Sequence, residues 1–135
     1  MSIKVTHKET EFGVGDVIKV YQVVTEGDKK RTQVFEGTVI SIKGRGELKT
    51  FTVRRMGAQQ VGIERIFPLE SPIIEKIEVV RPGTSGIRRA KLYYTREKST
   101  KEIEKIYSRT NKESSQKKIQ KHAAKKKASK DKKSK

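Results

Sequence analysis

The two histidines are the residues most able to act as a general base or an imidazole metal ligand at neutral pH. His7 and His122 lie near opposite ends of the chain, and neither has a partner at the spacing that such a site needs. The sequence contains no cysteine, which excludes a disulfide, a thiolate metal site and a thiol nucleophile. We therefore expect no metal and no other cofactor.

Two glycine pairs have the G-x-G form that begins some phosphate-binding loops. The segments 13–15 and 44–46 lack both the third glycine of a dinucleotide fingerprint and the Gly-Lys-Ser/Thr of a P-loop, so turns are the better interpretation. We interpret the acidic residues of the body as surface ion pairs rather than as paired catalytic carboxylates: Glu64, Glu70, Glu75 and Glu78. We expect neither an enzyme nor a small-molecule substrate.

Positive charge is the chemical feature that dominates this sequence. The 135 residues include 33 Lys and Arg against 16 Asp and Glu, which gives a formal net charge of +17. Such a surface concentrates phosphate groups around itself, so the expected partner is a polyanion. No apolar run approaches the roughly 20 residues that span a bilayer, and we expect a soluble protein of the cytoplasm.

Arginine and lysine occur in short clusters beside the predicted turns. The planar guanidinium fork can bind two phosphate oxygens at once and keeps its charge, which suits contact with an RNA backbone. Pairing with a nearby glutamate is the alternative for some of them, for example for Arg65 beside Glu64. It is weaker for the cluster after the Pro-Gly turn, since residues 86–96 contain no acid. The candidate RNA-binding residues of the body are Arg45, Lys49, Arg54, Arg55, Arg65, Arg81, Arg88, Arg89, Lys91 and Arg96.

The last part of the chain is a lysine-rich tail. Residues 117–135 contain ten Lys and one Asp, a net charge of +9, which leaves +8 for residues 1–116. Their few apolar side chains bury too little surface to offset the entropy of ordering, so we expect a tail that is disordered when free. Lys125, Lys126 and Lys127 are its candidate RNA contacts. A tail that only aids solubility would be expected to mix acids with its lysines.

The elements that must position the basic clusters are β-strands. Five segments are rich in Val, Ile, Thr, Phe and Tyr, and turn signals separate them. They are residues 16–24, 31–43, 48–56, 59–67 and 73–81. Five short strands with tight turns favour a small closed barrel.

Alternation along these segments predicts which side chains face the core. Phe51 and Val53 should face inward and Thr52 outward, while Val61 shares one face with Ile63 and Phe67. In the second strand Val39 and Ile40 break the alternation, and a β-bulge or sharp bend at Gly37 would explain the change of parity.

A helix is expected after the strands. Residues 99–102, Ser-Thr-Lys-Glu, form a capping-box pattern, and Ile103, Ile106 and Tyr107 follow as an apolar stripe. We therefore divide the chain into an N-terminal extension (1–11), a barrel with its basic loop (12–94), a C-terminal helix (95–110) and the lysine-rich tail (111–135). The fold class is mainly β. In an extended segment Tyr93 and Tyr94 would point to opposite sides, one onto the barrel and the other either to the core or to a base or ribose.

Four segments carry a resemblance to a known family. They are Phe51-Thr-Val-Arg-Arg-Met, Val61-Gly-Ile-Glu-Arg-Ile-Phe-Pro-Leu-Glu-Ser-Pro72, Ile77-Glu-Val-Val-Arg81 and Arg88-Arg-Ala-Lys-Leu-Tyr-Tyr94. In this order and spacing the chain resembles the bacterial large-subunit ribosomal protein L-nineteen family, over roughly residues 12–96.

The resemblance implies an SH3-like β-barrel that binds large-subunit ribosomal RNA near the face that meets the small subunit. It also implies neighbouring large-subunit proteins and contact with small-subunit RNA at an intersubunit bridge. Because the sequence has no basic amphipathic helix with a large apolar face, we expect no membrane partner. The matching segments place the RNA contacts at Arg54, Arg55, Arg88, Arg89 and Lys91. A free nucleic-acid-binding or RNA-chaperone module, with the same charge and tail but no attachment to ribosomes, stays open as the alternative.

Overall fold

The computed structural model describes residues 4–83, 87 and 89–106, and these comprise seven strands and three short 3-10 helices, followed by helical residues 100–106. The strands are β1 (Lys4–His7), β2 (Thr10–Gly13), β3 (Val17–Glu26), β4 (Lys29–Lys43), β5 (Thr50–Met56), β6 (Gly62–Pro68) and β7 (Ile74–Arg81), and the 3-10 helices are η1 (Gly46–Leu48), η2 (Ala58–Gln60) and η3 (Tyr93–Arg96). All seven strands and η3 belong to one compact unit, made of residues 1–83 and 87–98. We call this unit the body.

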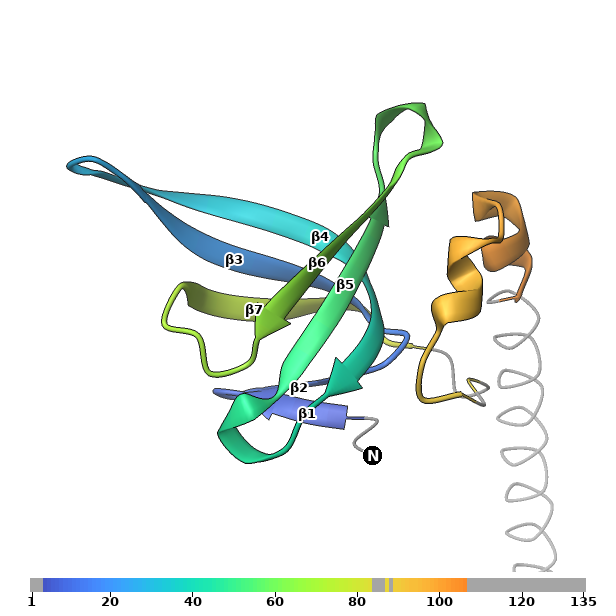
Figure 1. Cartoon of the computed structure of the whole chain (residues 1–135), viewed down its shortest axis with the longest axis horizontal. Helices are drawn as coiled ribbons and strands as arrows, with labels where there is room; N and C mark the ends of the chain where they lie inside the picture. The colour runs from blue at the N-terminus through green and yellow to red at the C-terminus, as the bar shows by residue number, and fades with distance from the viewer. Residues whose placement is uncertain (1–3, 84–86, 88, 107–135) are drawn as a thin grey trace, which may run out of the picture. The chain divides into compact units, whose positions relative to one another are not determined.

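A five-stranded antiparallel sheet with the strand order β6-β5-β4-β3-β7 forms most of the body (Figure 1). The mainly β prediction is confirmed, and each predicted strand has its counterpart. Closure of the sheet was also predicted and is not found, because β6 and β7 remain the two edges of the hydrogen-bonded sheet. Side chains of β3, β4 and β6 and of the connection to β7 instead line an open groove of about 720 Å³.

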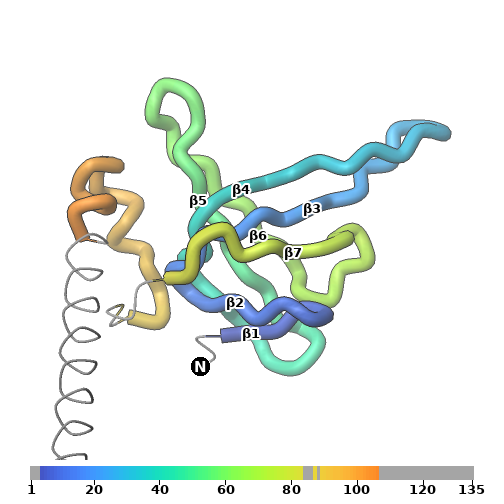
Figure 2. The backbone as a smooth tube through the Cα atoms, turned by 180° about the vertical axis from the view of Figure 1, so that it is seen from behind, coloured from blue at the N-terminus to red at the C-terminus, as the bar shows by residue number. Residues whose placement is uncertain are grey.

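Two hairpins extend beyond the five strand segments that the sequence predicted. β3 and β4 stay paired from Val17 opposite Thr38 to Glu26 opposite Lys29, and form an arm that projects from the sheet (Figure 2). β1 and β2 pair as a separate hairpin, which lies in the predicted N-terminal extension (1–11) and in the first two residues assigned to the barrel. Its inward positions are few, since β1 buries only Val5 and His7, and so short an alternation gives little signal in a sequence.

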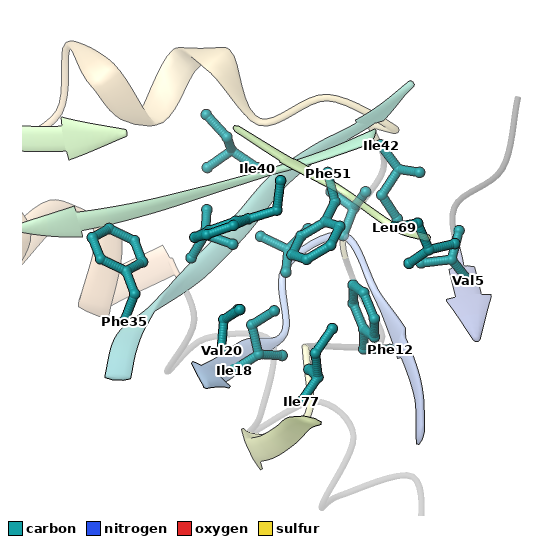
Figure 3. Packing of buried hydrophobic residues seen from close by; sticks show 14 of the residues in the cluster. Val5, Phe12, Ile18, Val20, Phe35, Ile40, Ile42, Phe51, Leu69 and Ile77 are labelled. Atoms are coloured by element: carbon teal, nitrogen blue, oxygen red, sulfur yellow. The ribbon is translucent and has the colours of Figure 1, made fainter. Parts of the chain in front are cut away.

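Four phenylalanines form a chain of ring contacts through the core. The ring of Phe51 lies 5.1 Å from that of Phe12 (Figure 3). It lies 5.4 Å from the ring of Phe67, which in turn is 5.9 Å from that of Phe35. Phe51 and Val53 are buried as predicted, and Thr52, on the opposite face of β5, is buried as well. Val61 is 58% exposed because β6 begins only after it.

The irregularity in β4 lies at Ile40 rather than at Gly37, which corrects the predicted position of the bulge. Pairing with β3 continues through Gly37, whereas the register with β5 shifts between Val39 and Ser41. The bulge leaves the Ile40 carbonyl oxygen to accept a hydrogen bond from the Leu92 backbone N–H, at 2.8 Å. Gly37 serves a different purpose, because a Cβ there would lie 2.6 Å from the carbonyl oxygen of Arg54.

Replacing Gly37 by alanine should therefore destabilise the body, since backbone atoms cannot move aside as a flexible side chain can. We expect the free energy of unfolding to fall by about 1–3 kcal/mol, measured by urea denaturation. Gly46→Asn is the control, because nothing lies within 4 Å of a Cβ at Gly46 and asparagine tolerates its φ of +55°. Equal stability of Gly37→Ala and wild type would contradict the close approach.

The helix start is partly as predicted. The Glu102 carboxylate accepts hydrogen bonds from the Ser99 backbone N–H at 2.9 Å and from the Ser99 hydroxyl at 3.2 Å, and the Ile103 N–H donates to the Ser99 carbonyl oxygen at 3.1 Å. The predicted helix over 95–110 begins later than expected, since its first residues belong to η3. The rest of the predicted helix, residues 107–110 with Tyr107, and the tail 111–135 lie outside the described residues.

Candidate nucleic-acid interface

Two arginines stack on the aromatic ring at the edge of the core. In the ladder between β5 and β6, Val53 lies opposite Arg65 and Arg55 lies opposite Ile63, so both arginines occupy the face of buried Val53. Their guanidinium carbons lie 5.0 Å (Arg55) and 5.2 Å (Arg65) from the centre of the Phe35 ring. Arg65 also donates to the side-chain oxygen of Gln22 at 3.1 Å. Both are exposed, and neither forms an ion pair with an acid in the described ranges.

Arg54, the sequence neighbour of Arg55, faces the other way and is paired. Its Nη1 lies 2.9 Å from the Glu64 carboxylate, which also accepts two hydrogen bonds from Arg96, at 2.8 Å and 2.7 Å. The hydrogen bond from Arg96 is the largest of the effects that lower the pKa of Glu64, and Arg54 adds to it. Glu64 thus pairs with Arg54 and Arg96 and not with Arg65, the partner that the sequence suggested. Arg54 and Arg96 share the single negative charge of Glu64, so the three side chains together keep one net positive charge.

The two ion pairs of Glu64 should make the stability of the body depend on pH. Because the folded pKa of Glu64 lies below its ordinary value of 4.5, the ion pairs stabilise the fold fully above that value. Their contribution is lost as the pH falls through the folded pKa. Glu64→Gln should reduce the free energy of unfolding by on the order of 1 kcal/mol at neutral pH, and by progressively less in acid.

Urea denaturation of wild type and Glu64→Gln at about pH 7 and about pH 3 measures this difference. Glu70→Gln is the matched control, because Glu70 is exposed and has no ion pair among the residues that the structure describes. A Glu64→Gln deficit that persisted unchanged in acid would exclude these ion pairs as its cause.

Gly83 and Leu92, on either side of the basic cluster in the sequence, each form a hydrogen bond with the body. Asp16 accepts hydrogen bonds from the backbone N–H groups of Gly13, at 2.7 Å, and of Gly83, where the chain leaves β7. At the far end Leu92 is fully buried and donates its N–H to Ile40. Of the residues between these two contacts, Arg89 and Lys91 are described cations. Arg88 lies outside the described residues.

The end of this segment gathers cations around two tyrosines. Lys91 Nζ lies 5.9 Å, Lys43 Nζ 5.8 Å and the Arg96 guanidinium carbon 4.6 Å from the centre of the Tyr93 ring. The guanidinium carbon of Arg89 lies 5.9 Å from that of Tyr94. Both tyrosines also pack against the core, and they lie in η3 rather than in the extended segment that we predicted.

Lys43 was not among the predicted contacts. Its position as the last residue of β4, just before the Gly44 turn, resembles that of Arg45 and Lys49. Lys43 differs from those two residues because Lys91 lies at the same Tyr93 ring, where the hydrogen bond between Leu92 and Ile40 holds it.

The remaining candidates lie apart from these rings. Arg45 and Lys49 flank η1, and Arg81 ends β7 opposite Val17. The side chains of all three lack hydrogen bonds and ion pairs within the described part of the chain. Lys125, Lys126 and Lys127 lie outside that part.

Metal binding and membrane crossing are two other roles to consider for the described residues. They contain no group of three or more His, Cys, Asp or Glu side chains that could hold a metal ion. None of their helices is both long enough and apolar enough to cross a membrane.

Comparison with known proteins gives the family. The model of the family described as "Ribosomal protein L19" matches residues 2–109. Proteins named "Large ribosomal subunit protein bL19" are similar to the chain in Thermosipho africanus (66% identical over 87 residues, 64% of this chain and 74% of the relative) and in Clostridium botulinum (54% identical over 88 residues, 65% of this chain and 75% of the relative). The one from Thermosipho melanesiensis is 64% identical over 86 residues, which are 64% of this chain and 73% of the relative. The chain therefore belongs to the ribosomal protein L-nineteen family.

Proposed function

We propose that the chain is a non-catalytic structural constituent of the large ribosomal subunit, and that it works in the cytoplasm by binding large-subunit ribosomal RNA. Family membership and the names of its relatives support the ribosomal part. The observation that carries the RNA contact is a set of cations that lie on aromatic rings and have no acid partner among the described residues: Lys43, Arg55, Arg65, Arg89 and Lys91.

Such an arrangement suits RNA that is recognised by shape and backbone. An aromatic ring restricts where a cation can lie, while the outer edge of the guanidinium or ammonium group stays available to phosphate. Double-stranded RNA is bound mostly through phosphate and 2′-hydroxyl groups, which needs no side chains that read bases. The chain would neutralise phosphates where RNA helices converge and so fix their packing.

Three finer features belong to the same proposal. The binding region lies near the face that meets the small subunit, the body contacts neighbouring large-subunit proteins, and it helps to form a bridge with small-subunit RNA. Lys125, Lys126 and Lys127 of the tail, together with Arg45, Lys49, Arg81 and Arg88, add further phosphate contacts. Arg54 and Arg96 contribute chiefly through the positive charge that remains after both have paired with Glu64.

Sedimentation of a cell lysate through sucrose gradients at moderate and high salt tests the proposal. Each fraction is probed for the chain, and we expect co-migration with large subunits and whole ribosomes at moderate salt. Recovery only in the light fractions would contradict it and favour a free nucleic-acid-binding or RNA-chaperone module.

A further inference from the structure

Lysines lie near the rings of two tyrosines of the body, Tyr21 and Tyr93. The two sites differ in whether a glutamate binds the lysine and the tyrosine hydroxyl. Lys76 Nζ lies 4.5 Å from the centre of the Tyr21 ring. Glu78 satisfies both groups, since it accepts a hydrogen bond from Lys76 at 2.7 Å and one from the Tyr21 hydroxyl at 2.8 Å. The hydrogen bond to Glu78 raises the pKa of Tyr21. The ammonium group of Lys76 and the hydroxyl of Tyr21 thus already have a partner within the body.

At Tyr93 the two lysines are present without an acid partner among the described residues. Neither Lys43 nor Lys91 forms an ion pair with a described acid, and the nearby Glu64 is occupied by Arg96 and Arg54. The pKa of Tyr93 is lowered, first by the Ser41 hydroxyl and then, against the effect of burial, by Lys43 and Lys91. Ser41 Oγ is buried and forms no hydrogen bond with the described residues, so its hydroxyl acts on Tyr93 as a nearby dipole.

The backbone fixes this convergence. Lys43 ends β4 just beyond the bulge at Ile40, and Lys91 immediately precedes the buried Leu92, whose N–H donates to the Ile40 carbonyl oxygen. The two lysines therefore meet at one ring although they are distant in sequence. Arg96, which is paired with Glu64, lies 4.6 Å from the centre of that ring.

We propose that Lys43, Lys91 and the Tyr93 hydroxyl form a binding site for one backbone phosphate of RNA, an inference that rests on the proposed function. The site offers two ammonium groups and a hydroxyl donor and lacks a carboxylate. A phosphodiester has one negative charge and two free oxygens, so it can supply what Glu78 supplies at Tyr21. The lowered pKa makes the Tyr93 hydroxyl a stronger hydrogen-bond donor to such an anion.

The test measures binding of the full chain to large-subunit RNA over a range of salt concentrations. Neutralising one phosphate contact lowers the slope of log K against log salt by about one. Lys43→Gln with Lys91→Gln should therefore reduce the slope by about one in total, if both lysines hold a single phosphate. Tyr93→Phe should weaken binding on the order of fivefold without changing the slope, because it removes a donor and no charge. Lys76→Gln, the matched lysine beside a tyrosine, should change neither quantity.

Each other outcome overturns the site. An unchanged slope in the double variant would mean that no phosphate is held there, and a decrease of about two would mean two separate phosphates. If the wild-type chain bound large-subunit RNA no more tightly than unrelated RNA, the proposed function would fail. The slopes could still be measured on the unrelated RNA, so the phosphate site would be judged separately.

Discussion

Phe51→Ala is expected to lower the free energy of unfolding by about 3–5 kcal/mol. Phe51 is 1% exposed and lies between two other rings, Phe12 at 5.1 Å and Phe67 at 5.4 Å. Alanine would remove the central ring of the aromatic chain and leave a cavity that strands of a hydrogen-bonded sheet cannot close. A domain of this size has a total stability of about 5–15 kcal/mol, so the variant should be only marginally folded.

Urea denaturation followed by circular dichroism measures this loss. Ile66→Ala is the control on the adjoining strand β6, because Ile66 is 69% exposed and its truncation should change the stability by less than about 0.5 kcal/mol. If Phe51→Ala cost no more than Ile66→Ala, Phe51 could not be central to the core.

Replacing both arginines over Phe35 should give the largest loss of RNA affinity. Arg55→Gln with Arg65→Gln removes two exposed charges that have no acid partner in the described ranges. Each lost phosphate contact should weaken binding on the order of tenfold at about 0.1 M salt, so the pair should cost about 100-fold. The fold should persist, because the strand pairing of β5 and β6 uses backbone atoms.

Lys19→Gln with Arg31→Gln provides a control of equal charge change. Lys19 lies 3.6 Å from Glu36, and Arg31 lies 2.7 Å from Glu26, so both charges are already balanced by acids. We expect this pair to weaken RNA binding far less than the Arg55 and Arg65 pair, as measured by filter binding at one fixed salt concentration. Equal losses would mean that charge acts in bulk and that the position over Phe35 is irrelevant.

Strand positions could be predicted from the sequence because alternation and turn residues are local properties. The bulge was harder to place, since Gly37 and Ile40 both lie where the alternation breaks. Only the register shift between Val39 and Ser41 and the hydrogen bond from Leu92 place the bulge at Ile40. Closure of the sheet depends on whether β6 meets β7, and neither strand carries a sequence signal that decides this.

In the candidate site, too, the sequence predicted which residues are basic but not which of them meet in space. The sequence identified Arg54 and Arg55 as one cluster, but adjacent residues of a strand face opposite sides. Arg54 therefore pairs with Glu64 while Arg55 lies on Phe35. The meeting of Lys43 with Lys91 requires the contact between β4 and the segment after β7, which no local pattern encodes.

Equilibrium binding of the purified chain to large-subunit ribosomal RNA, at a series of salt concentrations and beside an unrelated RNA of equal length, tests the central claim most directly. The account predicts tighter binding to the large-subunit RNA and a steep linear fall of log K with log salt, as release of counterions from many phosphate contacts requires. A flat salt response, or equal affinity for the two RNAs, would contradict it.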